Sequence, residues 1–188
     1  WRCPVLPRAI VKFDVFNGDA DGICALLQLR LTNPHKTTRV TGIKRDIALL
    51  DRVNAVSGDH VTVLDISMAQ NQQPLRRLLG EGVTVDYIDH HDPAEIPEHP
   101  GLTTMISEAP EVCTSLLVNG RLRGAQVTWA VVGAFGDNLD EPAQQLGAGV
   151  PVQHADRRHR RHPDTALRSG QDDRRSTSLA RRRKKDPC

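Results

Sequence analysis

The sequence predicts an α/β fold with a mainly parallel sheet and helices on both faces, followed by an irregular basic C-terminal tail. Over residues 10–140, short runs typical of strands alternate with segments of helical periodicity. Such alternation is typical of strands joined by crossover helices, which make neighbouring strands parallel. The 188 residues suffice for one ordinary domain and a tail. We therefore divide the chain into an N-terminal extension (1–9), a domain (10–147) and an Arg-rich tail (148–188).

The first half of the domain predicts two strands, each followed by a helix. Residues 10–16 (IVKFDVF) alternate apolar and polar side chains and end at a Gly/Asp-rich loop, which predicts a strand. The Leu-rich run 22–31 predicts a largely buried helix. Residues 40–43 predict a short strand, and 46–56 predict an amphipathic helix because their apolar residues recur at helical spacing.

The second half repeats this pattern and ends in two helices. The runs 61–66 (VTVLDI) and 83–88 (VTVDYI) predict strands. Between them, 71–79 has leucines at helical spacing before two glycines that act as a stop signal. Residues 111–118 and 126–135 predict two further helices, the second of which ends at a glycine.

The domain and the tail have opposite charge. Residues 150–188 carry 12 Lys or Arg and 5 Asp or Glu, whereas the first 149 residues carry 13 and 18. This composition excludes a globally basic nucleic-acid-binding domain. The tail has no apolar periodicity. Three interpretations stay open for it: a disordered segment, an arm that binds nucleic acid, or the remnant of a shifted reading frame.

Hydropathy and cysteine spacing predict a cytoplasmic protein. No run approaches the roughly 18 apolar residues of a transmembrane helix, and the first residues lack the pattern of a secretion signal. The four cysteines are scattered without CxxC spacing, which argues against a zinc knuckle and a disulfide framework. We therefore expect a reduced protein with no membrane partner, in which Cys24 and Cys113 belong to the core.

Acidic residues and histidines occur where predicted strands or helices end. They are Asp19 and Asp21 after the first strand, Asp65 at the end of the third, Asp89, His90 and His91 after the fourth, and Asp137 after a helix. The carboxyl ends of parallel strands meet at one edge of a sheet, so we expect these side chains to share one site.

Crowded carboxylates repel one another unless cations neutralise them. Oxygen ligands with one or two imidazoles favour Mn²⁺ or Mg²⁺ over a closed zinc site. Two such ions about 3.5–4 Å apart can clamp a phosphoryl group for in-line attack by water. The pattern therefore predicts a centre for divalent metal ions, with two ions as the expected number.

Some of these residues have other interpretations when taken alone. The loop 17–22 (NGDADG) also fits the start of a calcium loop. That motif needs a preceding helix and a Glu at its twelfth position, whereas here a strand precedes the loop and the twelfth residue is Gln28. Thr114 and Ser115 could either bind phosphate or cap the following helix.

Taken together, the residues resemble the DHH phosphoesterase superfamily. Residues 13–21, the strand ending at Asp65, the triplet 89–91 and Asp137 are similar to its motifs one to four. The superfamily includes single-strand-specific exonucleases, oligonucleotide and cyclic-dinucleotide phosphodiesterases, exopolyphosphatases and family II inorganic pyrophosphatases. The resemblance covers residues 10–140. It implies a divalent-metal-dependent phosphoesterase that hydrolyses phosphodiester or phosphoanhydride bonds by metal-activated water.

The resemblance also implies a role for each site residue. Asp19 would bind one ion and Asp21 the other, Asp65 would bridge both, His90 and Asp137 would ligate the second ion, His91 would face the substrate phosphate, and Asp89 would orient the histidines. The fourth motif is loose, and Asp140 is an alternative to Asp137 for that position. His91 and Asp89 are therefore the candidate catalytic residues, and the other five are candidate metal ligands.

Two departures from the family pattern bear on activity. Members have either a His four residues before the first loop Asp or an Asp two residues before it, where this chain has Val15 and Asn17. Asn17 is neutral and therefore a weaker ligand. Family members also continue into a smaller domain with a Gly-rich, His-containing substrate loop, and no such pattern follows Gly147. A truncated or diverged domain that binds metal or nucleotide without catalysis is thus an alternative.

The expected substrate is small. The chain has six aromatic residues, 2 Trp, 1 Tyr and 3 Phe, which leaves few platforms on which a long single strand could stack. A short oligonucleotide, a dinucleotide or polyphosphate fits this composition. Nucleic acid bound through the basic tail is the third functional hypothesis. The sequence leaves open whether the chain forms a homodimer.

Overall fold

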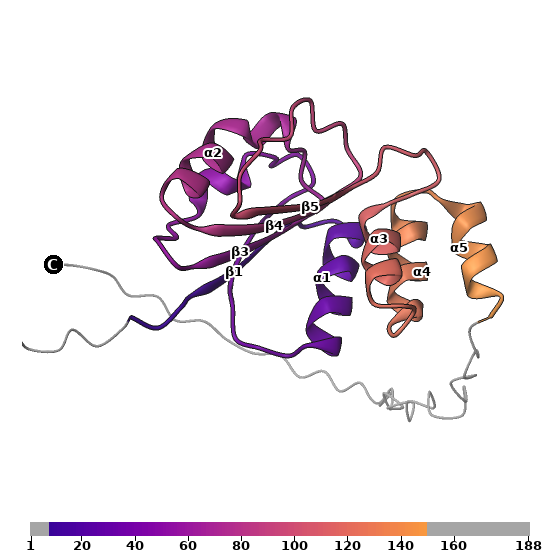
Figure 1. The fold of residues 1–188 in the computed structure, drawn as a ribbon. Coiled ribbons are helices and arrows are strands. Elements are labelled where there is room, and N and C mark those ends of the chain that lie inside the picture. The colour runs from indigo at the N-terminus through magenta and orange to yellow at the C-terminus, as the bar shows by residue number, and fades with distance from the viewer. Residues whose placement is uncertain (1–7, 150–188) are drawn as a thin grey trace, which may run out of the picture. The chain divides into compact units, whose positions relative to one another are not determined.

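Five parallel strands form the centre of the structure, a computed structural model that describes residues 8–149 (Figure 1). The strands are β1 (Lys12–Asn17), β2 (Thr38–Gly42), β3 (His60–Leu64), β4 (Thr84–Asp89) and β5 (Leu102–Ile106). Their order in the sheet is β2-β1-β3-β4-β5, and every neighbouring pair is parallel. This confirms the predicted α/β class. The predictions for the Arg-rich tail lie outside the described residues.

Helices cover both faces of the sheet, as predicted. The helical segments are α1 (Ala20–Thr32), the 3-10 turns η1 (Leu49–Arg52) and η2 (Ala69–Asn71), α2 (Gln72–Gly80), α3 (Thr114–Arg121), α4 (Val127–Gly136) and α5 (Asp140–Gly147). Figure 1 shows α2 on one face and α1, α3 and α4 on the other, with α5 beyond α4.

Alternation along the strands sends side chains into two hydrophobic clusters. Phe13 and Val15 of β1 pack with the leucines of η1 and α2 on one face. Phe16 of β1, Leu64 and Ile88 pack with α1 and α3 on the other face. The period of two residues along each strand explains this division. The sheet is therefore buried on both faces, as in other parallel sheets.

The predicted helix over 46–56 is wrong, because only Leu49–Arg52 is helical and forms a short 3-10 turn. The buried Asn71 side chain explains the difference. Its Oδ1 accepts a hydrogen bond from Leu50 N, and its Nδ2 donates to the carbonyls of Ile47 and Ser67. The bonds to Leu50 and Ile47 satisfy backbone groups that a helix over 46–56 would have paired internally. These groups therefore do not require a longer helix.

Strand β5 and helix α5 were not predicted from the sequence. Residues 102–106 (LTTMI) form an edge strand whose side chains are half-buried or exposed, so the run has little apolar pattern. Helix α5 is a short, mostly polar segment that buries Ala143. The hydrophobic periodicity of β5 and α5 is weak because both elements bury few side chains. Neither element changes the fold class.

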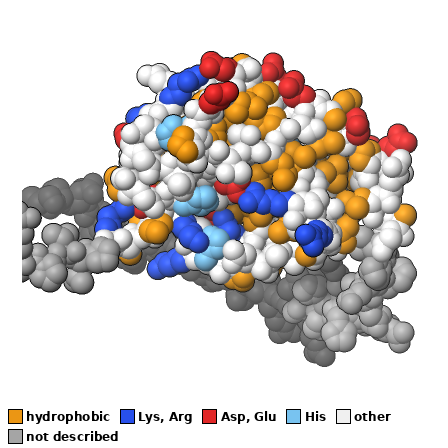
Figure 2. Space-filling model, viewed as in Figure 1, with side chains coloured by type: hydrophobic (Ala, Val, Ile, Leu, Met, Phe, Trp, Pro, Cys, Tyr) orange, Lys and Arg blue, Asp and Glu red, His pale blue; other side chains and the backbone are white. Residues whose placement is uncertain are grey.

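The helical layer of α3, α4 and α5 has an apolar surface. In the face shown in Figure 2, hydrophobic side chains gather on the right, where Figure 1 has these helices. Trp129, Val132 and Phe135 of α4 are exposed. Cys24 and Cys113 are buried, as predicted. Among residues 8–149, none of the helices combines the length and apolar character that crossing a membrane requires.

Candidate metal centre

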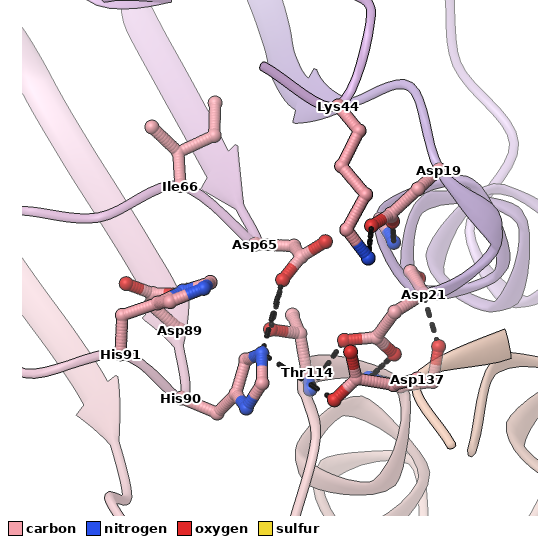
Figure 3. A network of polar contacts seen from close by, with 12 residues as sticks. Asp19, Asp21, Lys44, Asp65, Ile66, Asp89, His90, His91, Thr114 and Asp137 are labelled. Carbon is pink, nitrogen blue, oxygen red and sulfur yellow. Dashed lines mark hydrogen bonds and ion pairs between the residues drawn. The ribbon is translucent and has the colours of Figure 1, made fainter. Parts of the chain in front are cut away.

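The carboxyl ends of β1, β3 and β4 meet at one edge of the sheet and form a polar cavity. The cavity has a volume of about 270 Å³. Its lining includes Asn17, Asp19, Lys44, Asp65, His90, His91 and Asp137. The structure therefore brings together side chains from loops up to 120 positions apart in the sequence, in the arrangement that the parallel sheet predicts. Figure 3 shows this arrangement from close by.

Asp65 is the central acidic residue of the cavity. It follows β3 directly, has a φ of 59°, and is only 2% exposed. A positive φ is strained for a residue with a side chain, and such strain tends to occur at functional sites. The Asp65 N–H donates to the Ile88 carbonyl of β4 at 3.1 Å, which fixes the backbone in this conformation.

The two carboxylate oxygens of Asp65 have different surroundings. Oδ1 lies 3.3 Å from His90 Nε2 and accepts a hydrogen bond of 3.4 Å from Thr114 Oγ1. Oδ2 is buried and has no hydrogen-bond partner among residues 8–149. Burial raises the pKa of Asp65 to about 7. A buried, unpaired carboxylate oxygen is costly, and a bound cation would remove that cost.

His90 lies between two carboxylates. Its Nε2 is 3.3 Å from Asp65 Oδ1 and 3.7 Å from Asp137 Oδ2. Burial lowers the pKa of His90, but the hydrogen bond to Asp65 and the charge of Asp137 outweigh this and raise it to about 9. The imidazole is therefore protonated at neutral pH when no metal is bound. An imidazole must be neutral to bind a metal, so metal binding would release this proton.

Asp21 caps a helix and also lies close to the candidate metal ligands His90 and Asp137. Its Oδ2 accepts from Thr114 N at 2.8 Å and its Oδ1 from Ser115 N at 2.7 Å. Asp21 therefore caps the N-terminus of α3 from α1, and it occupies the backbone groups that could have bound phosphate. One oxygen of Asp21 nevertheless lies within 4.8 Å of ligand atoms of His90 and Asp137. Each carboxylate oxygen keeps a further lone pair for a cation.

Asp89 and His91 form a second hydrogen-bonded pair at the edge of the cavity. His91 Nδ1 donates to Asp89 Oδ1 at 2.7 Å, and Asp89 is completely buried at the end of β4. This hydrogen bond raises the pKa of His91 and fixes the orientation of its ring. His91 also belongs with Asp65 and His90 to a group whose ligand atoms lie within 4.8 Å of one another. The centroids of the His91 and His90 rings are 4.4 Å apart.

Asp19 begins α1 and carries an ion pair that was not predicted from the sequence. Its Oδ1 accepts a hydrogen bond of 3.2 Å from Gly22 N, which makes it the N-cap of the helix. Its Oδ2 lies 3.0 Å from Lys44 Nζ. Burial raises the pKa of Asp19, but the bonds to Lys44 and Gly22 outweigh this and lower it below its ordinary value. Lys44 follows β2, which the parallel sheet brings to the same edge as the acidic loops, but a lysine is not a metal ligand and did not belong to the predicted site.

The calcium-loop interpretation of residues 17–22 does not hold. These residues form the end of β1 and the first turn of α1. Gln28, at the position of the calcium-binding Glu, is buried in α1, and its Nε2 donates to the Ser115 carbonyl at 3.1 Å. Asn17 Oδ1 is buried and lacks a hydrogen-bond partner within the described part of the chain. It remains a candidate weak ligand.

Asp137 is placed in the cavity by the end of α4. It is the C-cap residue of this helix, and its N–H donates to the carbonyl of Gly133. A side chain at Gly136 would clash with Ala20 at the start of α1, so this glycine allows the two helix ends to approach. Burial raises the pKa of Asp137. Asp140, the alternative for the fourth motif, is exposed at the start of α5.

The residues present fit a divalent metal ion. Asp19, Asp65 and Asp137 line the cavity together with His90 and His91, and one oxygen of Asp21 lies within 4.8 Å of ligand atoms of His90 and Asp137. Asp65 Oδ2 and Asn17 Oδ1 are buried and unpaired in the region that the structure describes. Hard oxygen ligands with one imidazole suit Mn²⁺ or Mg²⁺. No protein-family model matches the chain, and no curated protein matches it either. The resemblance to DHH phosphoesterases therefore rests on the sequence motifs alone.

Proposed function

We propose that the protein is a divalent-metal-dependent phosphoesterase of the DHH type, with Mn²⁺ or Mg²⁺ as its cofactor. One observation carries the proposal. Asp65 is buried at the meeting point of the strand ends, with one oxygen beside His90 and the other without a partner among residues 8–149. A protein that keeps such a carboxylate in a strained backbone conformation loses stability unless a cation compensates.

The ligand set would consist of Asp19, Asp21, Asp65, His90 and Asp137, with Asn17 as a weak further ligand. A divalent ion bound there lowers the pKa of water and neutralises charge on a phosphoryl group. Asp65 is the candidate bridge because it lies nearest to both His90 and the Asp19 side of the cavity (Figure 3).

The pair of Asp89 and His91 would act on the substrate. The buried Asp89 carboxylate orients the His91 ring through Nδ1 and leaves Nε2 as the second nitrogen. Because its pKa is raised, His91 keeps a proton at neutral pH more readily than an ordinary histidine. A protonated imidazole at the cavity edge can donate a hydrogen bond to a phosphoryl oxygen or a proton to a leaving group.

A small substrate is consistent with the cavity. Its volume of about 270 Å³ lies just below the usual range for ligand pockets, about 300–1,000 Å³. A phosphoryl group with part of its substituent would fill it. We therefore propose a short oligonucleotide, a dinucleotide or polyphosphate as substrate, and a cytoplasmic location for the reaction. Nucleic-acid binding by the tail and homodimer formation stay predictions.

Hydrolysis of bis(p-nitrophenyl) phosphate with Mn²⁺ tests the proposal. We expect turnover by the wild-type chain and a loss of about 10²-fold or more in Asp65→Asn, which keeps the side-chain shape but removes the charge. Asp51→Asn is the matched control, because Asp51 is an exposed carboxylate that does not line the cavity. Equal rates in the wild type and Asp65→Asn would refute the catalytic role of the centre.

A non-catalytic metal-binding domain is the second candidate function. The neutral Asn17 and the ion pair between Lys44 and Asp19 favour it, because both weaken the attraction of this side of the cavity for a metal ion. It predicts Mn²⁺ binding in calorimetry together with no turnover on nitrophenyl phosphodiesters, short oligonucleotides or polyphosphate. Turnover that depends on Asp65 would exclude it.

A further inference from the structure

The ammonium group of Lys44 occupies the Asp19 side of the cavity. Lys44 Nζ lies 3.0 Å from Asp19 Oδ2. Figure 3 shows the side chain extending from the loop after β2 toward the space between Asp19 and Asp65. Lys44 lines the same cavity as His90 and Asp137. A positive charge that belongs to the chain is therefore already present among the carboxylates.

The backbone around Lys44 is held in place by local contacts. Asp46 N donates to the Ile43 carbonyl at 2.7 Å, which closes a turn with Lys44 as its second residue. A side chain at Gly18 would clash with the Gly42 carbonyl, so the loops after β1 and β2 touch through two glycines. These contacts bring the backbone of Lys44 close to the start of α1. The ion pair therefore follows from the fold of both loops.

The two sides of the cavity differ in the ligands they offer. On one side, single ligand atoms of Asp21, His90 and Asp137 lie within 4.8 Å of one another. On the other side, Asp19 shares its oxygens with Gly22 N and Lys44 Nζ, and its neighbour Asn17 is neutral. Asp65 lies between the two sides. Its buried Oδ2 is unpaired as far as residues 8–149 are concerned, and this oxygen is therefore available to a cation.

We propose that Lys44 acts as the built-in cation of the Asp19 side, so that the centre binds one divalent ion and not two. The single ion would be held by Asp21, Asp65, His90 and Asp137. This inference rests on the proposed function. In place of the two expected metal ions, the centre would hold one exchangeable metal ion and the ammonium group of Lys44. A second dication beside Lys44 would have to overcome the repulsion of the ammonium at close range. Asp46, a further carboxylate that lines the cavity, is already paired with Arg52.

Mn²⁺ alone is the probe, and the number of bound ions is the readout. The full chain is titrated by calorimetry and examined by electron paramagnetic resonance, which detects coupling between ions about 3.5–4 Å apart. We expect one Mn²⁺ and an uncoupled spectrum for the wild type. Lys44→Met keeps much of the aliphatic stem and removes the charge, and it should bind two ions and show a coupled spectrum. Its fold should persist because the Lys44 side chain is 64% exposed.

Two further variants separate charge from other effects. Lys44→Arg keeps the positive charge and should bind one ion, as the wild type does. Arg45→Met removes a positive charge from the next residue, which is exposed, and should also leave one ion. Two ions in the wild type, or one ion in Lys44→Met, would overturn the role of Lys44 while leaving the proposed function intact. Absence of Mn²⁺ binding in the wild type and in Lys44→Met would refute the proposed function as well.

Discussion

Buried carboxylates at the two ends of the sheet differ in how many hydrogen-bond donors surround them. Asp14 of β1 accepts hydrogen bonds from Arg30 Nε at 2.9 Å and from Thr37 Oγ1 at 2.7 Å, with Arg30 Nη2 on its other oxygen. Asp59, just before β3, accepts two bonds from Arg8 and one each from the N–H groups of Val11 and Val56. Both carboxylates are saturated by donors of the chain.

At the carboxyl ends of the same strands, donors are lacking. Asp65 and Asp89 are as buried as Asp14 and Asp59, yet each has one oxygen without a partner among the residues described. The positive groups nearby are the exposed Lys44 and two histidines, His90 and His91, which carry charge only while protonated. Saturated carboxylates hold the fold together, whereas unsaturated ones in a cavity leave room for a cation. This difference distinguishes a structural acid from a candidate ligand.

The largest effect on stability is expected at Asp14. Asp14→Ala should lower the free energy of unfolding by about 3–5 kcal/mol, because it leaves the largely buried Arg30 guanidinium without its partner. Urea denaturation measures the change. Asp51→Ala, at an exposed residue of η1, is the control and should change stability by less than about 0.5 kcal/mol. Similar losses in the two variants would contradict the structural role of Asp14.

The carboxyl end should respond to pH through its affinity for metal. Because the pKa of His90 is about 9, one proton must leave for each ion bound at neutral pH. We expect the Mn²⁺ affinity to rise about tenfold per pH unit from pH 7 to 9, which corresponds to about 2.7 kcal/mol in total. Below pH 7, Asp65 is protonated as well and the dependence should be steeper.

Calorimetry in buffers of different ionisation enthalpy checks this prediction. It should show the release of close to one proton per Mn²⁺ at pH 8. An affinity that stays constant between pH 7 and 9 would mean that His90 is not a ligand or is not paired as the structure shows.

A smaller effect is expected at Asp59. The hydrogen bonds from Arg8 keep the pKa of Asp59 well below its usual range, so the ionised form contributes stability above the unfolded-state pKa of about 3.9. Asp59→Asn should lose about 1 kcal/mol at pH 7. The difference from the wild type should shrink as the pH falls below about 4, since the Asp59 carboxylate of the unfolded chain then gains a proton while that of the folded chain stays ionised. Urea denaturation of the wild type and Asp59→Asn at pH 7 and pH 3 measures this difference in the free energy of unfolding. An equal difference at both pH values would contradict the prediction.

The sequence was sufficient to predict four of the five strands and the edge of the sheet at which most of the candidate site residues lie. Strands that end in Asp65 and Asp89 have strong apolar patterns, and parallel strands place their following residues at one edge. This topology alone predicts that Asp19, Asp65 and His90 meet. The apolar pattern of a sequence predicts which segments are buried, and the order of these segments along the chain predicts how the strands are connected.

The parts that could not be predicted depend on single polar contacts. Asn71 replaces part of the backbone pairing of a longer helix through side-chain hydrogen bonds to Leu50 and Ile47, and no periodicity signals this. Lys44 enters the cavity because a turn and two glycines bring two loops together. The capping of α3 by Asp21 also joins residues far apart in the chain. Such contacts depend on tertiary geometry that local patterns do not contain.

The stabilisation of the protein by Mn²⁺ tests most directly whether the carboxyl end of the sheet is built for a cation. At a free Mn²⁺ concentration of 100 times the dissociation constant, the wild type should gain about 2.7 kcal/mol in its free energy of unfolding. Asp59→Asn should gain as much, because its carboxylate is already saturated by the chain, whereas Asp65→Asn should gain nothing measurable. Equal stabilisation of Asp65→Asn and the wild type would contradict the assignment of Asp65 and its neighbours as the metal centre.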